Sequence, residues 1–155
     1  MTATEGQPAP SFTLQDQNGD SISLDSLSGS GVVLFFYPKA FTPGCTTEAC
    51  DFRDSHVPLE QAGYRVFGVS PDPVARLADF QAEHGLPYPL LSDPDHEVAE
   101  SYGAWGKKTN YGKEYMGLIR STFVIDGDGV LTGAYRNIRA KGHVARLRAD
   151  LLGED

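Results

Sequence analysis

Two cysteines and their neighbours are the part of this sequence best suited to chemistry. Cys45 and Cys50 are the only cysteines in the 155 residues. Cys45 follows Thr42 and Pro43, which are a good N-cap and a good first helical residue. Cys45 would then lie in the first turn of a helix, where free backbone amides favour the thiolate, the nucleophilic form of the side chain. We therefore predict a reactive cysteine at position 45.

The spacing of the two cysteines limits how they can act together. In an intact α-helix their Cα atoms would lie about 8 to 9 Å apart, on faces about 140° apart. Disulfides rarely span more than about 7 Å between Cα atoms. If Cys45 and Cys50 pair, the start of the helix must unwind.

Metal binding is not favoured by the sequence. A structural zinc site needs four cysteine or histidine ligands, and the histidines show no ligand spacing to Cys45 and Cys50. We interpret Asp93-Pro94-Asp95-His96 as a turn followed by a helix cap. We expect each histidine to be a surface residue: His56, His84, His96 and His143.

The composition excludes several classes of partner. The net charge of -8 disfavours nucleic acid and anionic membranes, because no basic patch is dense enough to offset it. Residues 1–11 contain no cationic segment followed by an apolar stretch, and no apolar run approaches the length of a membrane span. We expect a soluble, cytoplasmic protein with a single domain over residues 1–155.

The first half of the chain alternates strand and helix. The apolar run from Val32 to Tyr37 predicts a central strand buried on both faces, which leads directly into the cysteine turn. A second strand is expected from Tyr64 to Val69. Asp72 would cap the helix that follows, with Pro73 as its first residue and Gly85 at its end.

Hairpins and a final helix complete the expected fold. Residues 12–24 predict a small hairpin around Asn18-Gly19, and residues 121–135 predict an antiparallel pair. Val144, Leu147 and Leu151 recur at helical spacing. Together these elements predict an α/β, thioredoxin-like fold with a mixed central sheet flanked by helices and an N-terminal β-hairpin extension. Cys45 then follows a central strand, where open α/β sheets build sites.

The cysteine turn resembles the active-site motif of peroxiredoxins, Pro38-x-x-x-Thr42-x-x-Cys45. The stretch from Phe36 to Asp54 is similar to the subgroup called bacterioferritin comigratory protein, or peroxiredoxin Q. The similarity covers nearly the whole chain and includes the stretch from Arg120 to Asp126. By this resemblance, Cys45 is the peroxidatic cysteine and Cys50 the resolving one, with Pro38, Thr42 and Arg120 completing the peroxide pocket.

The residue types suit these roles. Arg120 is a permanent cation that would stabilise a thiolate and donate to peroxide oxygens. The hydroxyl of Thr42 would bond the peroxide, and Pro38 would shield the thiolate from water. Glu48 would relay a proton or position a water, or it is simply a favourable charge in the first turn of a helix.

The resemblance also implies a reaction. The protein would reduce hydrogen peroxide and organic hydroperoxides through a Cys45 sulfenic acid and a Cys45–Cys50 disulfide, as part of antioxidant defence. Thioredoxin or a similar dithiol reductant would recycle it, and no metal or other cofactor is needed. The C-terminal resolving cysteine of typical two-cysteine peroxiredoxins is absent, so the chemistry does not require a dimer, and the resemblance to the subgroup implies a monomer.

Two other activities remain open from the residues alone. A disulfide reductase or isomerase would share this fold, although the five-residue cysteine spacing speaks against it. A non-catalytic redox sensor would also use a reactive cysteine, but it would not need Thr42 and Arg120 together with a resolving thiol.

Overall fold

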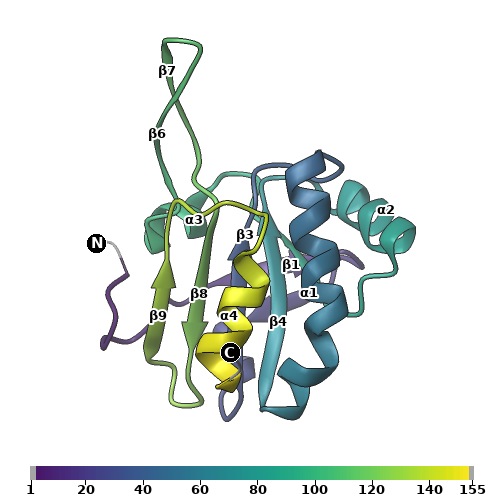
Figure 1. Cartoon of the computed structure of the whole chain (residues 1–155), viewed down its shortest axis with the longest axis vertical. Helices are drawn as coiled ribbons and strands as arrows, with labels where there is room; N and C mark the ends of the chain where they lie inside the picture. Colours follow the sequence, from purple (N-terminus) through teal and green to yellow (C-terminus); the bar gives the residue numbers. More distant parts are fainter. Residues whose placement is uncertain (1–2, 154–155) are drawn as a thin grey trace.

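The computed structural model describes residues 3–153 of the chain. Within them, seven strands form one mixed sheet, at the centre of Figure 1. In spatial order they are β2 (Ser21–Ser23), β1 (Thr13–Asp16), β5 (Leu90–Ser92), β4 (Tyr64–Ser70), β3 (Gly31–Phe36), β8 (Ser121–Ile125) and β9 (Leu131–Tyr135). Strand β3 pairs parallel to β4 and antiparallel to β8, which confirms the predicted central strand and mixed sheet.

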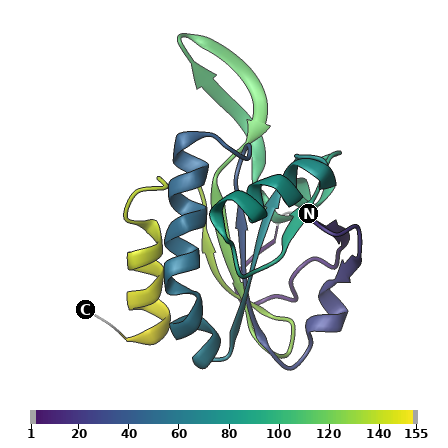
Figure 2. The same ribbon diagram turned by 90° about the vertical axis from the view of Figure 1, so that its right-hand side faces the viewer.

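Helices cover both faces of this sheet. They are η1 (Leu24–Leu27), α1 (Pro43–Gln61), α2 (Val74–His84), α3 (Glu97–Tyr102) and α4 (His143–Leu152). Helices α1 and α4 lie side by side on one face (Figures 1 and 2). No helix among residues 3–153 combines the length and the apolar character that crossing a membrane requires.

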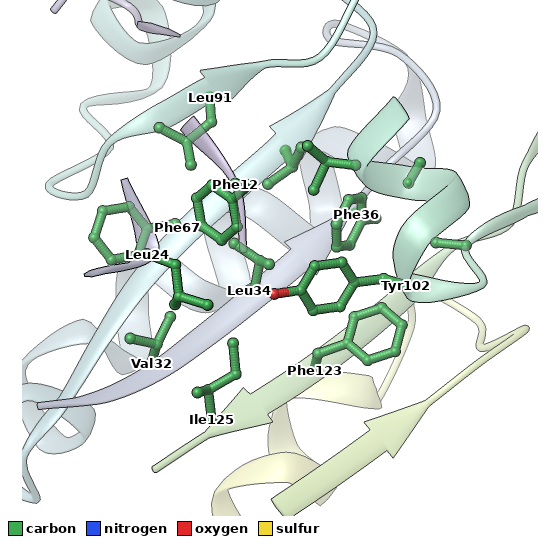
Figure 3. Close-up of a cluster of buried hydrophobic side chains, with 14 of the residues drawn as sticks. Phe12, Leu24, Val32, Leu34, Phe36, Phe67, Leu91, Tyr102, Phe123 and Ile125 are labelled. Carbon is green, nitrogen blue, oxygen red and sulfur yellow. The ribbon is translucent and has the colours of Figure 1, made fainter. Parts of the chain in front are cut away.

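Two apolar cores form because successive side chains of a strand point to opposite faces. Val33, Phe35 and Tyr37 pack with buried residues of α1, α2 and α4. Val32, Leu34 and Phe36 pack on the other face, with α3 and the N-terminal segment (Figure 3). Both cores therefore hold β3, the strand that leads to the cysteine turn.

A glycine in β4 makes room for the aromatic residues of β3. A Cβ atom on Gly68 would lie 2.9 Å from Phe35 Cζ and 2.8 Å from Leu90 Cδ2, closer than real Cβ contacts allow. Phe35 in turn stacks on Phe52 of α1, with ring centroids 4.4 Å apart. Gly68 thus lets α1 pack closely on the sheet.

The predicted hairpins are present, with one difference. Strand β1 pairs with β2 as expected, but it also pairs with β5. The N-terminal hairpin is therefore the edge of the main sheet rather than an extension from it. The pair β8 and β9 and the C-terminal helix α4 are confirmed.

The prediction for the cap of α2 was half right. Gly85 ends the helix in the left-handed conformation, as expected. The N-cap is Pro73, however, and the first helical residue is Val74. Asp72 does not cap, because its carboxylate accepts hydrogen bonds from Ala40 N at 2.7 Å and Ser70 Oγ at 2.8 Å.

A second, two-stranded sheet projects from the body of the molecule (Figure 1). It consists of β6 (Trp105–Asn110) and β7 (Lys113–Leu118), which pair antiparallel. Tyr111 and Gly112 join them with φ angles of 53° and 77°, as a tight hairpin turn requires. Arg120 lies two residues after the end of β7.

Candidate active site

Tertiary contacts hold the loop between β3 and α1. Besides the bond from Ala40 to Asp72, Arg76 Nη2 donates to Ala40 O at 3.2 Å. The Arg76 guanidinium also lies over the Phe41 ring, 5.0 Å from its centroid. Phe41 has a φ of 69°, a conformation that side chains other than glycine rarely adopt. The contacts with α2 and the end of β4 therefore fix a strained turn just before the cysteine.

Helix α1 begins as predicted, with Thr42 at the N-cap and Pro43 as the first helical residue. The Thr42 side chain makes no capping bond; its hydroxyl instead donates to Lys39 O at 2.8 Å. The amides of Gly44 and Cys45 lie in the first turn, where a helix supplies no internal acceptor. Cys45 is thus the third helical residue, as expected.

Cys45 and Arg120 meet at the start of α1. The Cys45 side chain is buried, and Arg120 Nη2 donates to its sulfur at 3.3 Å. A Cβ atom on Gly44 would lie 3.2 Å from the same nitrogen. The glycine before the cysteine therefore leaves room for the guanidinium.

Glu48 lies one turn after Cys45 and is wholly buried. Its Oε1 accepts a hydrogen bond of 2.7 Å from Arg120 Nη1, and its Oε2 has no hydrogen-bond partner among the described residues. Burial raises the pKa of Glu48 to about 7, although Arg120 opposes the rise. The alternative interpretation of Glu48 as a favourable charge in the first turn of the helix was wrong, because Glu48 lies beyond the first turn of α1 and its buried side chain accepts from Arg120.

One guanidinium therefore contacts two acidic groups. The Arg120 side chain is 16% exposed and joins the Cys45 sulfur to the Glu48 carboxyl. Burial lowers the pKa of Arg120, but Glu48 and Cys45 more than offset this, so the pKa is raised overall. Arg120 stays charged next to the sulfur, as a site for a thiolate requires.

Cys50 lies on the same helix and is partly exposed. Both cysteines are free thiols, and α1 is continuous across them. The buried hydroxyl of Tyr88 donates to Ala49 O at 2.7 Å, between the two cysteines. The structure thus shows the unpaired form with an intact helix.

His143 corrects a prediction. It was expected at the surface, but it is 5% exposed, with Nε2 2.8 Å from Thr122 Oγ1. Burial lowers its pKa to about 4, and the positive charges of Arg120 and Arg146 act in the same direction. His143 is therefore neutral at pH 7. The other three histidines are partly exposed.

The cap predicted from Asp93-Pro94-Asp95-His96 is confirmed. The Asp93 carboxylate accepts hydrogen bonds from Val98 N at 3.3 Å and Ala99 N at 2.9 Å, in the first turn of α3. Sequence reasoning missed the roles of Asp72 and Tyr88. The position of Asp72, just after the parallel strand β4, is a signal that would have pointed to the site.

A cavity of about 530 Å³ lies beside Arg120. Pro38, the last residue proposed for the pocket, lines it together with residues of β6 and of the loop after β9. Its lining residues are Pro38, Gly103, Lys107, Lys108, Thr109, Ile119, Arg120, Arg136, Asn137 and Ile138. The structure therefore brings Pro38 and Arg120 to one cavity, next to the buried Cys45.

Comparisons with known proteins show the family of this chain. Residues 5–134 match the model of the AhpC/TSA family. A putative peroxiredoxin of Mycobacterium tuberculosis is 52% identical over 148 residues, which cover 96% of this chain and 94% of that protein. Peroxiredoxin Bcp of Bacillus subtilis is 47% identical over 145 residues, covering 94% of this chain and 92% of the relative.

A solved structure shows the same fold. The bacterioferritin comigratory protein of Xanthomonas campestris, described for its alkyl peroxide reduction activity, superposes with a TM-score of 0.89 at 33% identity. The match covers 97% of this chain and 98% of that one.

Proposed function

Because this chain belongs to the AhpC/TSA family and is a peroxiredoxin, we propose that Cys45 is its peroxidatic cysteine and Cys50 its resolving cysteine. The sequence was compatible with a peroxidase, a disulfide reductase or isomerase, and a redox sensor. The activity of the family favours the peroxidase. The single observation that carries the assignment is the contact of 3.3 Å between Arg120 Nη2 and the Cys45 sulfur.

In the first step, the Cys45 thiolate attacks one oxygen of the hydroperoxide. A sulfur–oxygen bond forms and the oxygen–oxygen bond breaks, so that Cys45 becomes a sulfenic acid. The leaving oxygen takes up a proton and departs as water or an alcohol. Arg120 and the free amides of the first turn of α1 stabilise the negative charge that develops on this oxygen.

Thr42 and Glu48 support this step. The Thr42 hydroxyl donates its hydrogen bond to Lys39 O. Its lone pairs are therefore free to accept a hydrogen bond from the O–H of the peroxide. Glu48 is a positioning residue, since its bond of 2.7 Å holds one end of the Arg120 guanidinium. Pro38 lines the cavity and donates no hydrogen bond through its backbone nitrogen.

In the second step, the Cys50 thiol attacks the Cys45 sulfenic acid. A disulfide forms and water leaves. The start of α1 must unwind first, because five helical residues separate the Cα atoms by about 8 to 9 Å. A dithiol reductant of the thioredoxin type then restores both thiols by exchange.

Other parts of the proposal follow from this chemistry. Neither step needs a metal or an organic cofactor. Both cysteines belong to one chain, so turnover does not require a second copy. We propose that residues 1–155 act as one domain, as a monomer in the cytoplasm.

Two serine variants test the assignment. Cys45→Ser should abolish peroxide consumption, whereas Cys50→Ser should consume about one equivalent and then stall with thioredoxin as the reductant. Peroxide is measured directly, and circular dichroism checks that both variants are folded. If Cys45→Ser retains full activity, Cys45 is not the peroxidatic residue.

A further inference from the structure

Exposed apolar side chains are concentrated on the β6–β7 projection. Among the residues that the structure describes, four large hydrophobic side chains are exposed, and three of them lie on this projection. They are Tyr111, Tyr115 and Met116, with exposed fractions of 97%, 46% and 58%. Apolar side chains that gather on the surface with polar neighbours are typical of a site that binds another protein. Tyrosine and methionine are also enriched at such interfaces.

The base of the projection is fixed to the body of the molecule. The Trp105 ring stacks on His96, with ring centroids 3.8 Å apart, and Leu118 is buried. Residues 111–116, beyond this base, are all exposed (Figure 1). The projection is therefore an anchored arm whose outer part is open to a partner.

A glycine lets one of the exposed rings lie against the strand. Tyr115 is paired across the hairpin with Lys108. A Cβ atom on Gly117 would lie 3.1 Å from Tyr115 Cε2 and 3.1 Å from Lys108 Cδ, and Lys108 Nζ donates to Leu118 O at 2.8 Å. Both side chains are held in place before any partner arrives, so binding costs less conformational entropy.

The projection is positively charged in a chain that is negative overall. Residues 105–118 contain three lysines and one glutamate, whereas the net charge of the whole chain is -8. Lys107 lies 3.2 Å from Glu114, which leaves Lys108 and Lys113 without a salt bridge among the described residues.

The positive surface continues on the body of the molecule. The cavity beside Arg120 and the groove that adjoins it have no carboxylate among their described lining residues. Away from the projection, their further cations are Arg136, Arg139, Lys141 and Arg146. A partner with an acidic surface would be attracted to this side of the molecule.

The projection rises from the end of the molecule at which α1 begins (Figures 1 and 2). Arg120, two residues after β7, contacts the Cys45 sulfur at this end. A protein that brings a thiol to a Cys45–Cys50 disulfide must approach here, and even a transient redox complex buries several hundred Å² on each partner. A second copy of the chain is not needed for the chemistry, whereas a reductant is.

We propose that the outer part of the β6–β7 projection is the docking surface for the protein that reduces the Cys45–Cys50 disulfide. The partner is a thioredoxin-type dithiol protein with an acidic surface beside its cysteines. Its thiolate attacks one sulfur of the disulfide and displaces the other as a thiolate. Its second thiol then breaks the mixed disulfide, so that this chain regains both thiols and the partner becomes a disulfide. This inference rests on the proposed function of the two cysteines and adds where their reductant binds.

Two reductants separate docking from chemistry. The double variant Tyr111→Asn/Met116→Thr removes exposed apolar groups but keeps the hairpin, because Asn-Gly is a favoured turn and threonine suits a strand. With hydrogen peroxide in excess, we expect KM for reduced thioredoxin to rise about five- to tenfold. Dithiothreitol is too small to need a docking surface, so turnover with it should be unchanged.

Val57→Ser is the matched control. Val57 is the fourth exposed large hydrophobic residue, and it lies on α1 about 18 Å along the helix axis from Cys45. Its substitution should leave KM for thioredoxin at the wild-type value.

The charge of the projection is tested separately. Lys113→Glu should raise KM for thioredoxin at low salt, whereas Lys113→Arg keeps the charge and should not. Added salt should raise the KM of the wild type, because it screens the attraction. A wild-type KM that does not respond to salt, together with an unaltered KM in Lys113→Glu, would contradict an acidic partner surface.

The inference can fail separately from the proposed function. An unchanged KM for thioredoxin in Tyr111→Asn/Met116→Thr, or an equal loss with dithiothreitol, would overturn the docking surface and leave Cys45 as the peroxidatic residue. A wild-type dimer on gel filtration that this variant dissociates without a change in KM would overturn it too, since the surface would then bind a second copy. Peroxide turnover by Cys45→Ser with either reductant would instead overturn the proposed function.

Discussion

Glu48 should make the protein less stable as the pH rises from acid to neutral. Burial raises its pKa from an ordinary 4.5 to about 7. The unfolded chain therefore ionises this group at a lower pH than the folded chain does. Its contribution to stability is fully present below about pH 4.5 and is lost as the pH rises through about 7.

The size of the effect follows from the same rise in pKa. An increase from 4.5 to about 7 corresponds to about 3 kcal/mol of unfolding free energy. Glu48→Gln removes the ionisation but keeps an oxygen that can accept from Arg120. Relative to this variant, the wild type should lose about 3 kcal/mol between pH 4.5 and pH 7.5.

Urea unfolding of the reduced proteins at several pH values measures this difference. Glu83→Gln is the matched control, because Glu83 is exposed on α2 and should leave the wild-type pH dependence unchanged. If the curves of wild type and Glu48→Gln run parallel over this range, Glu48 does not titrate as a buried group and the reasoning fails.

Activity should respond to the same titration. Above pH 7 the ionised Glu48 holds Arg120 by a charge-assisted bond, which the amide of Glu48→Gln makes more weakly. We expect kcat/KM for hydrogen peroxide to fall about tenfold in the variant at pH 8, or about 1.4 kcal/mol. The gap should narrow towards pH 6, where Glu48 of the wild type becomes neutral. A constant ratio of the two proteins from pH 6 to pH 8 would contradict a positioning role.

Three further substitutions test other contacts. Arg120→Lys should lower kcat/KM for peroxide at least about tenfold in a thioredoxin-coupled assay. One ammonium cannot reproduce the guanidinium fork that joins the Cys45 sulfur to the Glu48 carboxyl. An unchanged kcat/KM would show that this contact plays no part in the mechanism. Tyr88→Phe deletes the hydrogen bond to Ala49 O, which restrains α1 between the two cysteines. Disulfide formation after oxidation should therefore speed up several-fold in acid-quench experiments. An unaltered rate would show that this bond does not restrain the helix. Gly44→Ala should displace the Arg120 guanidinium and slow the reaction of Cys45 with peroxide. It should not lower Tm, since alanine favours the helix. A faster or equal rate would argue against the close approach of Arg120 to position 44.

Local rules were enough to predict the cysteine turn. Thr42 and Pro43 begin α1 because capping and proline preferences act over a few residues. The buried run before them placed β3 at the centre of the sheet for the same kind of reason. The position of Cys45 could therefore be derived from its neighbours alone.

Contacts distant in sequence decided what local rules could not. Glu48 is buried because it meets Arg120, 72 residues further on. Asp72 does not cap α2 as expected, because its carboxylate accepts a hydrogen bond from the backbone amide of Ala40, 32 residues earlier. His143 is covered by the sheet and α1, which its own surroundings in the chain do not show. Such residues could not be assigned before the topology was known.

The β6–β7 projection was missed for a different reason. Its strands carry lysines and glycines rather than alternating apolar residues, and Tyr115 and Met116 remain exposed. It has no buried face to give a period of two. The cavity that it helps to form was therefore beyond sequence reasoning.

Peptide mass mapping after oxidation is the most direct test of the paired cysteines. Tryptic cleavage after Lys39 and Arg53 yields one peptide, residues 40–53, that contains both Cys45 and Cys50. After one equivalent of hydrogen peroxide, we expect this peptide to become about 2 Da lighter, through loss of two hydrogens, and to resist thiol alkylation. Two alkylated thiols after the peroxide has been consumed, or a disulfide only between chains, would contradict the central claim.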